Sequence, residues 1–170
     1  MINRMNKQIT WKDNLALFMP FLIMFLLYGS STMSYESQSL VSPLETLLAG
    51  RPFENLLKNI QFTYAGSEIS IASRGYIPFV EFFIRKAAHF FSYFFIGFFW
   101  VLGLRKRVND EWLVLLLAVL LSIGYASFDE LRQVFHPGRT GLMEDVLLDT
   151  AGAMVGIFFS WFLLKKRMIR

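Results

Sequence analysis

Residues 129–149 read DELRQVFHPGRTGLMEDVLLD, and this stretch decides how the rest of the chain is interpreted. It holds many charged and polar side chains between two apolar runs, one from Trp112 to Phe128 and one from Val146 to Leu164. Each run is long enough to cross a bilayer as a helix. Charged groups placed close to hydrocarbon cost about 2.5–3.5 kcal/mol each. The stretch is therefore expected to be a polar hairpin between two membrane spans and a candidate functional site.

Composition supports a membrane protein. Of the 170 residues, 55% are hydrophobic and 18% are charged, which is too apolar for a soluble domain of this size. The absence of cysteine excludes disulfides, a thiol nucleophile and a cysteine metal site. The net charge of +4 does not indicate nucleic-acid binding, because the basic residues cluster at the ends of spans. We expect an all-α integral membrane protein with no nucleic-acid partner and no cofactor.

The apolar runs predict a four-transmembrane-helix bundle in a single membrane domain, with spans at residues 14–33, 78–104, 112–135 and 145–164. No small-residue cleavage site follows the first run, so we interpret it as an uncleaved span and not as a signal peptide. Ten of the 17 lysines and arginines lie beside spans, in the N-terminal segment, at 105–107 and at 165–170. The positive-inside rule then places both termini in the cytoplasm and the polar hairpin outside.

Residues 34–77 interrupt the apolar pattern and are expected to form a small extracytoplasmic helix and hairpin segment. Ser42, followed by proline and glutamate, predicts the N-cap of a short helix that ends near Gly50. A second short helix is predicted over residues 52–60, and both helices are compatible with the membrane interface plane. Alternation around a glycine turn over residues 61–71 predicts a small hairpin.

Polar groups from three spans are expected to meet in one layer. His89, Asp129 and Asp149 each lie 16 or 17 residues from the opposite end of their span. At 1.5 Å per residue this is about 24–26 Å, against a hydrocarbon core of about 30 Å. Helical spacing groups these side chains on shared faces, Lys86 with His89 and Tyr93, Asp129 with Gln133, and Asp145 with Asp149. Because facing lipid is costly, they are expected to point at one another.

The fourth span also carries Gly152 and Gly156 in a GxxxG spacing. This spacing is typical of close helix packing, and it leaves a homodimer open.

These residues resemble the VanZ-like family. The resemblance rests on Lys86-x-x-His89-x-x-x-Tyr93, on Asp129-Glu130-x-x-Gln133-x-Phe135-x-Pro137-Gly138-Arg139-Thr140-Gly141, and on Asp145-Val146-Leu147-Leu148-Asp149-Thr150-x-Gly152. It implies a small multi-pass protein of the bacterial cell membrane, in a family whose founding member is associated with teicoplanin resistance. His136 and Arg132 depart from the family pattern and are left outside the set. Carried over position by position, the candidate binding residues are Lys86, His89, Tyr93, Asp129, Glu130, Gln133, Arg139, Asp145 and Asp149.

Several functions remain open for this set. The first is a site that binds an anionic membrane lipid or a lipid-linked envelope precursor, with arginine holding phosphate. The second is a lipid phosphate hydrolase or transferase, with His89, Asp129 and Asp149 as catalytic candidates. A purely structural ion-pair cluster is a third. A proton-coupled transporter is disfavoured because the inner halves of the spans lack a polar path. A metal site is not predicted, because nearby lysine and arginine repel cations.

Overall fold

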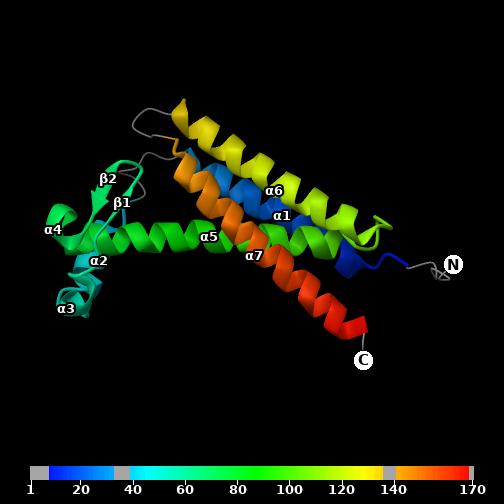
Figure 1. Ribbon diagram of the computed structural model, residues 1–170, viewed down its shortest axis with the longest axis horizontal. Helices are drawn as coiled ribbons and strands as arrows, with labels where there is room; N and C mark the ends of the chain where they lie inside the picture. The colour runs from blue at the N-terminus through cyan, green and yellow to red at the C-terminus, as the bar shows by residue number, and fades with distance from the viewer. Residues whose placement is uncertain (1–7, 33–38, 136–140, 169–170) are drawn as a thin grey trace.

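The computed structural model describes residues 8–32, 39–135 and 141–168. This part of the chain contains four long helices, and Figure 1 shows the short elements gathered around one end of the helix labelled α5. In chain order the elements are α1 (Trp11–Ser31), α2 (Val41–Leu47), α3 (Glu54–Leu57), β1 (Phe62–Tyr64), β2 (Ser67–Ile69), α4 (Ile71–Arg74), α5 (Tyr76–Leu104), α6 (Glu111–Val134) and α7 (Met143–Met168).

The helices α1, α5, α6 and α7 are long and apolar enough to span a membrane, and the shortest of them has 21 residues. At 1.5 Å per residue, that helix is about 32 Å long and exceeds a hydrocarbon core of about 30 Å. Large apolar side chains point outward from these helices; Phe25 is 70% exposed and Leu116 is 53% exposed. An apolar outer surface suits lipid. The predicted all-α, four-span membrane architecture is therefore confirmed.

The helix ends lie a few residues from the predicted span limits. Helix α1 begins at Trp11 because Thr10 and Asp13 form a capping box ahead of it. Helix α5 begins at Tyr76 and accommodates Pro78 in its first turn, where a missing backbone N–H is tolerated. Helix α6 continues through Gln133, as its pattern indicated.

Helix α5 is the centre of the bundle, and the core lies where α6 and α7 meet it. A Cβ atom at Gly152 would collide with the carbonyl oxygen of Phe90, and one at Gly156 with that of Phe94. The two glycines therefore allow α5 and α7 to approach closely, as the GxxxG spacing predicted. Because α5 covers this glycine face, the face lends no support to a homodimer, which stays a prediction.

The bundle has two chemically different ends. At the basic end, where α1 and α6 begin and α5 and α7 finish, Lys106 Nζ donates to the buried Asp13 carboxylate at 2.8 Å. Arg107 donates to the carbonyl oxygens of Asp13 and Gly103 at 3.2 and 2.6 Å. These bonds fasten the start of α1 to the end of α5. We call the opposite end the polar end.

A cap, formed by residues 39–75, surrounds the first turns of α5 at the polar end (Figure 1). The predicted N-cap at Ser42 is wrong, because α2 begins one residue earlier, at Val41. The Ser39 hydroxyl, at 3.2 Å, accepts from the Val41 N–H instead. The second predicted helix shortens to Glu54–Leu57, because Phe53 adopts a left-handed conformation immediately before it.

The predicted hairpin is present. Strands β1 and β2 pair antiparallel, with Phe62 opposite Ile69 and Tyr64 opposite Ser67. Its two-residue turn, Ala65-Gly66, has positive φ at both positions, as a type I′ turn requires. Helix α4 was not predicted; the Ser70 hydroxyl caps it by accepting from the Ser73 N–H at 3.0 Å. The hairpin rests on α5 through ring contacts of Phe62 and Tyr64 with Phe82.

Candidate functional site

Helix α5 contributes one face to the polar end, because Lys86, His89 and Tyr93 follow helical spacing. Lys86 Nζ forms an ion pair with the carboxylate of Asp145 on α7. One turn deeper, His89 Nδ1 lies 3.5 Å from Asp149 Oδ2. Tyr93 is fully buried, and its hydroxyl has no hydrogen-bond partner among the described residues. Polar side chains of α5 therefore contact carboxylates of α7 directly.

Helix α6 contributes a second group, centred on the buried carboxylate of Asp129. That carboxylate accepts from Ser31 Oγ at 2.8 Å and from Arg132 at 3.1 Å. Gln133 Nε2 donates to Asp129 at 3.3 Å and to Glu130 at 3.2 Å. Three donors on one buried carboxylate join the end of α1 to the end of α6.

Glu130 joins α6 to the start of α7. Its Oε2 atom accepts from the backbone N–H of Leu142 at 2.9 Å, just before α7 begins. Among the described residues, the donors to Glu130 are this N–H and the Gln133 side chain, and both are neutral. The carboxylate therefore fixes the entry of α7 without a cation bonded to it among the described residues.

The hairpin supplies a side chain that the sequence analysis missed. Tyr64 donates its hydroxyl hydrogen to Asp145 Oδ1 at 2.5 Å, and Lys86 Nζ lies 4.8 Å from the centre of the Tyr64 ring. Burial, followed by the hydrogen bond to Asp145, raises the pKa of Tyr64 far above its usual range. The phenol therefore stays protonated and remains a donor. Tyr64, Lys86 and Asp145 link the hairpin, α5 and α7.

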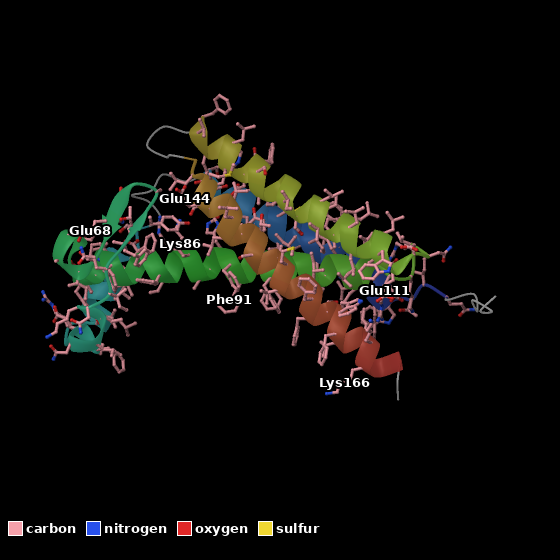
Figure 2. The ribbon with its side chains drawn as sticks, in the orientation of Figure 1. Glu68, Lys86, Phe91, Glu111, Glu144 and Lys166 are labelled. Carbon is pink, nitrogen blue, oxygen red and sulfur yellow. The ribbon has the colours of Figure 1, made fainter. Side chains whose placement is uncertain are left out.

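A cavity of about 730 Å³ lies between the cap and the helices at the polar end. A volume of this size falls in the range of about 300–1,000 Å³ that is typical of small-molecule sites. Figure 2 shows Lys86 on α5 beside the hairpin and near Glu144 at the start of α7. The polar and charged residues that line the cavity are Ser30, Tyr64, Ser67, Arg74, Arg85, Lys86, His89, Ser92, Glu130, Gln133, Asp145 and Asp149.

Some side chains of the cavity lining are accessible from the cavity, and others are buried behind them. The His89 side chain is 31% exposed, whereas that of Asp149 is 1% exposed. Neither oxygen of Asp149 has a hydrogen-bond partner among the described residues. A buried carboxylate next to one imidazole nitrogen orients the ring and stabilises its protonated form. The arrangement suits acid–base chemistry as well as binding.

The structure brings eight of the nine sequence candidates together at the polar end. The ninth, Arg139, lies outside the described residues, as does His136. Asp149, and not Asp129, is the carboxylate beside His89, because Asp129 is taken up by its own three donors. Among the described residues, no three His, Asp or Glu side chains are placed to hold a metal ion.

Sequence reasoning also left out Arg132, which contacts Asp129 and stacks 4.2 Å from the Tyr28 ring centre. The spacing from Asp129 to Arg132, i to i+3 on one helix, was an available signal. Ser31 had a weaker signal, as the last residue of the first span. Tyr64 had none, because 81 residues separate it from Asp145.

A family model described as VanZ/LLP1 matches residues 16–165, which include α5, α6 and most of α1 and α7. No curated protein and no solved structure matches the chain.

Proposed function

Because this chain belongs to the VanZ/LLP1 family and has four membrane-spanning helices, we propose that its polar end binds a phosphate-bearing lipid headgroup. The ligand class is an anionic membrane lipid or a lipid-linked cell-envelope precursor. The observation that carries the proposal is the cavity, which combines basic side chains, buried carboxylates and apolar walls in one membrane protein. The family resemblance to proteins of teicoplanin resistance fits an envelope precursor as ligand.

Basic side chains on the cap side of the cavity supply the phosphate contacts. Arg74 ends α4, and Arg85 and Lys86 lie on α5. Arg74 uses its Nε to donate to the carbonyl oxygen of Glu68 at 3.2 Å, and its guanidinium lies over the Phe82 ring. That arrangement directs Arg74 while leaving its terminal nitrogens as phosphate donors, and a guanidinium can bind phosphate through two parallel hydrogen bonds.

The carboxylates hold these cations in place. Asp145 pairs with Lys86, and Glu81 lies 3.5 Å from Arg85. A cation held by a neighbouring carboxylate is positioned before the ligand arrives, so less side-chain entropy is lost on binding. The remaining carboxylates and Gln133 are suited to contact hydroxyl groups of a sugar or glycerol headgroup.

The apolar part of the lining suits the portion of a lipid next to its headgroup. Large apolar side chains reach the cavity from α1, the cap, α5, α7 and the residue before α7: Leu27, Leu40, Ile69, Phe82, Leu148 and Leu142. A soluble anion would gain nothing from such walls, whereas an amphiphile buries apolar surface against them. We place the cavity on the extracytoplasmic side of the bacterial cell membrane, with both termini cytoplasmic, by the positive-inside rule.

Native mass spectrometry of the detergent-purified protein tests the proposal. We expect a co-purifying phosphate-bearing lipid in the wild type and its loss in Lys86→Met. Lys166→Met is the matched control, since Lys166 is an exposed lysine at the basic end (Figure 2). If the two variants retain the same lipid as the wild type, the cavity does not bind the headgroup and a structural ion-pair cluster is the better account.

A second function is favoured by one specific observation, the pair of His89 and Asp149. The imidazole lines the cavity, and the buried carboxylate lies behind it at 3.5 Å. With Asp149 orienting Nδ1, the other ring nitrogen could act as a general base or nucleophile on a bound lipid phosphate. Turnover of polyprenyl or glycerolipid phosphates by the purified protein, lost in His89→Ala, is the expected result for an enzyme. Lipid binding without turnover would support headgroup binding and argue against an enzyme.

A further inference from the structure

The cap has a part that faces away from the cavity, formed by α2, α3 and the turn between them; we call residues 41–57 the foot. Three large apolar side chains of the foot are almost free of protein contact. Leu47 is 78% exposed, Phe53 is 75% exposed and Leu56 is 72% exposed. Phe53 directly precedes α3 and Leu56 is the third residue of α3, so the two lie within about one turn of each other along the chain. The foot thus presents an apolar surface outside the four long helices.

The conformation of the foot is held by specific contacts with its surroundings. In its turn, Arg51 and Phe53 adopt positive φ values of 44° and 64°. L-residues with bulky side chains rarely take this conformation, and surrounding structure is needed to hold it. Here the Pro52 carbonyl oxygen accepts from the Tyr76 hydroxyl at 2.5 Å, and Arg51 pairs with Glu54 at 3.2 Å. The exposure of Phe53 is therefore imposed by the fold.

The foot is attached to the first turns of α5, a helix with exposed apolar side chains. Leu44 is buried where α2 packs on α5, and Phe83 and Ile84 of α5 are each 39% exposed. Figure 1 shows α3 extending sideways from the end of α5, on the opposite side of that helix from the hairpin. Since α5 crosses the bilayer, a sideways extension from its end runs along the membrane surface.

We propose that the foot is an interfacial anchor, which docks Leu47, Phe53 and Leu56 into the headgroup and upper acyl region of the bilayer. A lipid surface is the occupant because the apolar face is continuous with a helix that already contacts lipid. Basic side chains flank it, Arg51 and Lys58, and both are long enough to extend toward lipid phosphates. The hydrogen bond from Tyr76 to Pro52 makes foot and span one unit. Docking therefore fixes the height of the cap and its cavity above the membrane.

The chain contains no cysteine, so one introduced cysteine is its only thiol. We would make Leu56→Cys and Leu47→Cys in the full-length chain, attach a polarity-sensitive fluorophore, and reconstitute each protein into phosphatidylcholine vesicles. Some vesicles contain lipid brominated near the headgroup end of the acyl chain. Glu45→Cys is the matched control, because Glu45 is an exposed residue of α2. Gel filtration checks that each labelled protein keeps the wild-type size.

We expect the labels at 56 and 47 to emit at shorter wavelength than the label at 45. Brominated lipid should quench them more strongly, and aqueous iodide less strongly, than it quenches the control. Equal iodide quenching at all three positions would overturn the proposal, because the apolar face would then lie in water. Equal quenching by brominated lipid at all three would also overturn it, because the foot would then have no membrane-facing side.

Discussion

The two ends of the bundle use the same kinds of side chain for different purposes. At the basic end, Lys106 and Arg107 bond to Asp13 and fasten one helix end to another. At the polar end, carboxylates and cations from α4, α5, α6 and α7 line a cavity. The difference lies in what each carboxylate bonds to. Asp13 has a lysine partner at 2.8 Å, whereas the hydrogen-bond donors described for Glu130 are neutral.

This difference distinguishes ion pairs that only join two helices from charged groups that are available to a ligand. A pair that only joins two helices needs one cation for each anion, and replacing such a pair with apolar residues often costs little. A buried carboxylate without a charged donor is costly unless something else uses it. At the polar end, the donors described for Glu130 are neutral, and the buried Asp149 has the His89 imidazole at 3.5 Å, which is a charged neighbour only when it is protonated. Substitutions at Asp129, Gly152, Lys106 and Tyr64 test whether the two ends differ in this way.

The largest effect is expected from Asp129→Ala. Removing this carboxylate leaves Arg132 without its anion, while Ser31 and Gln133 each lose one of their acceptors. Breaking a buried ion pair by removing one partner costs about 3–5 kcal/mol. The free energy of unfolding in detergent, followed by circular dichroism, measures it. Asp129→Asn is the control, and it should lose less because the amide still accepts hydrogen bonds. A loss below about 1 kcal/mol would place Asp129 with the weak surface pairs.

A smaller effect is expected from Gly152→Ala, because a methyl group there would strike the Phe90 carbonyl and push α7 away from α5. Overpacking of this kind costs about 1–3 kcal/mol. Gly152 lies one turn from Asp149, so the variant should also weaken lipid binding by separating His89 from Asp149. Gly124→Ala on α6 is the matched control, since a Cβ there meets nothing within 4 Å. It should stabilise the protein by about 0.5–1 kcal/mol. Equal stability of both variants would contradict the close approach of α5 and α7.

Some of these contacts could be predicted from the sequence, and others could not. The shared layer of His89, Asp129 and Asp149 was predictable because helical rise is regular and polar groups avoid lipid. Which carboxylate faces which donor was not, because that depends on how each helix is rotated about its axis. Spacing within α6 could have included Arg132, whereas the contact of Tyr64 depends on where the hairpin rests on Phe82. Ser42 failed as an N-cap because the bond from Leu40 N–H to Glu81, at 2.7 Å, sets where α2 begins.

At the basic end, Lys106→Met should lower stability by about 1 kcal/mol, the usual net value of a hydrogen bond. The loss is modest because Asp13 keeps its bonds to the Thr10 N–H and hydroxyl, at 2.8 and 2.5 Å. The amount of co-purified lipid, measured by native mass spectrometry, should stay at the wild-type level, in contrast to Lys86→Met. Lipid loss as large as in Lys86→Met would show that the basic end also contributes to lipid binding and is not purely structural.

The smallest effect near neutral pH is expected from Tyr64→Phe, which removes one hydrogen bond to Asp145 and about 1 kcal/mol of stability. Asp145 keeps its ion pair with Lys86, so the α5–α7 contact survives.

The pH dependence of stability is a more specific test of the Tyr64 environment. Because folding raises the pKa of Tyr64, the folded state holds a proton that the unfolded chain releases above about pH 10. Stability from this group is therefore complete below that pH and declines as pH rises above it, by up to about 1.4 kcal/mol per pH unit. Denaturation of wild type and Tyr64→Phe between pH 8 and 11 measures the difference, which should shrink above about pH 10. A constant difference across that range would mean that Tyr64 is not buried against Asp145, and that the hairpin does not close the polar end.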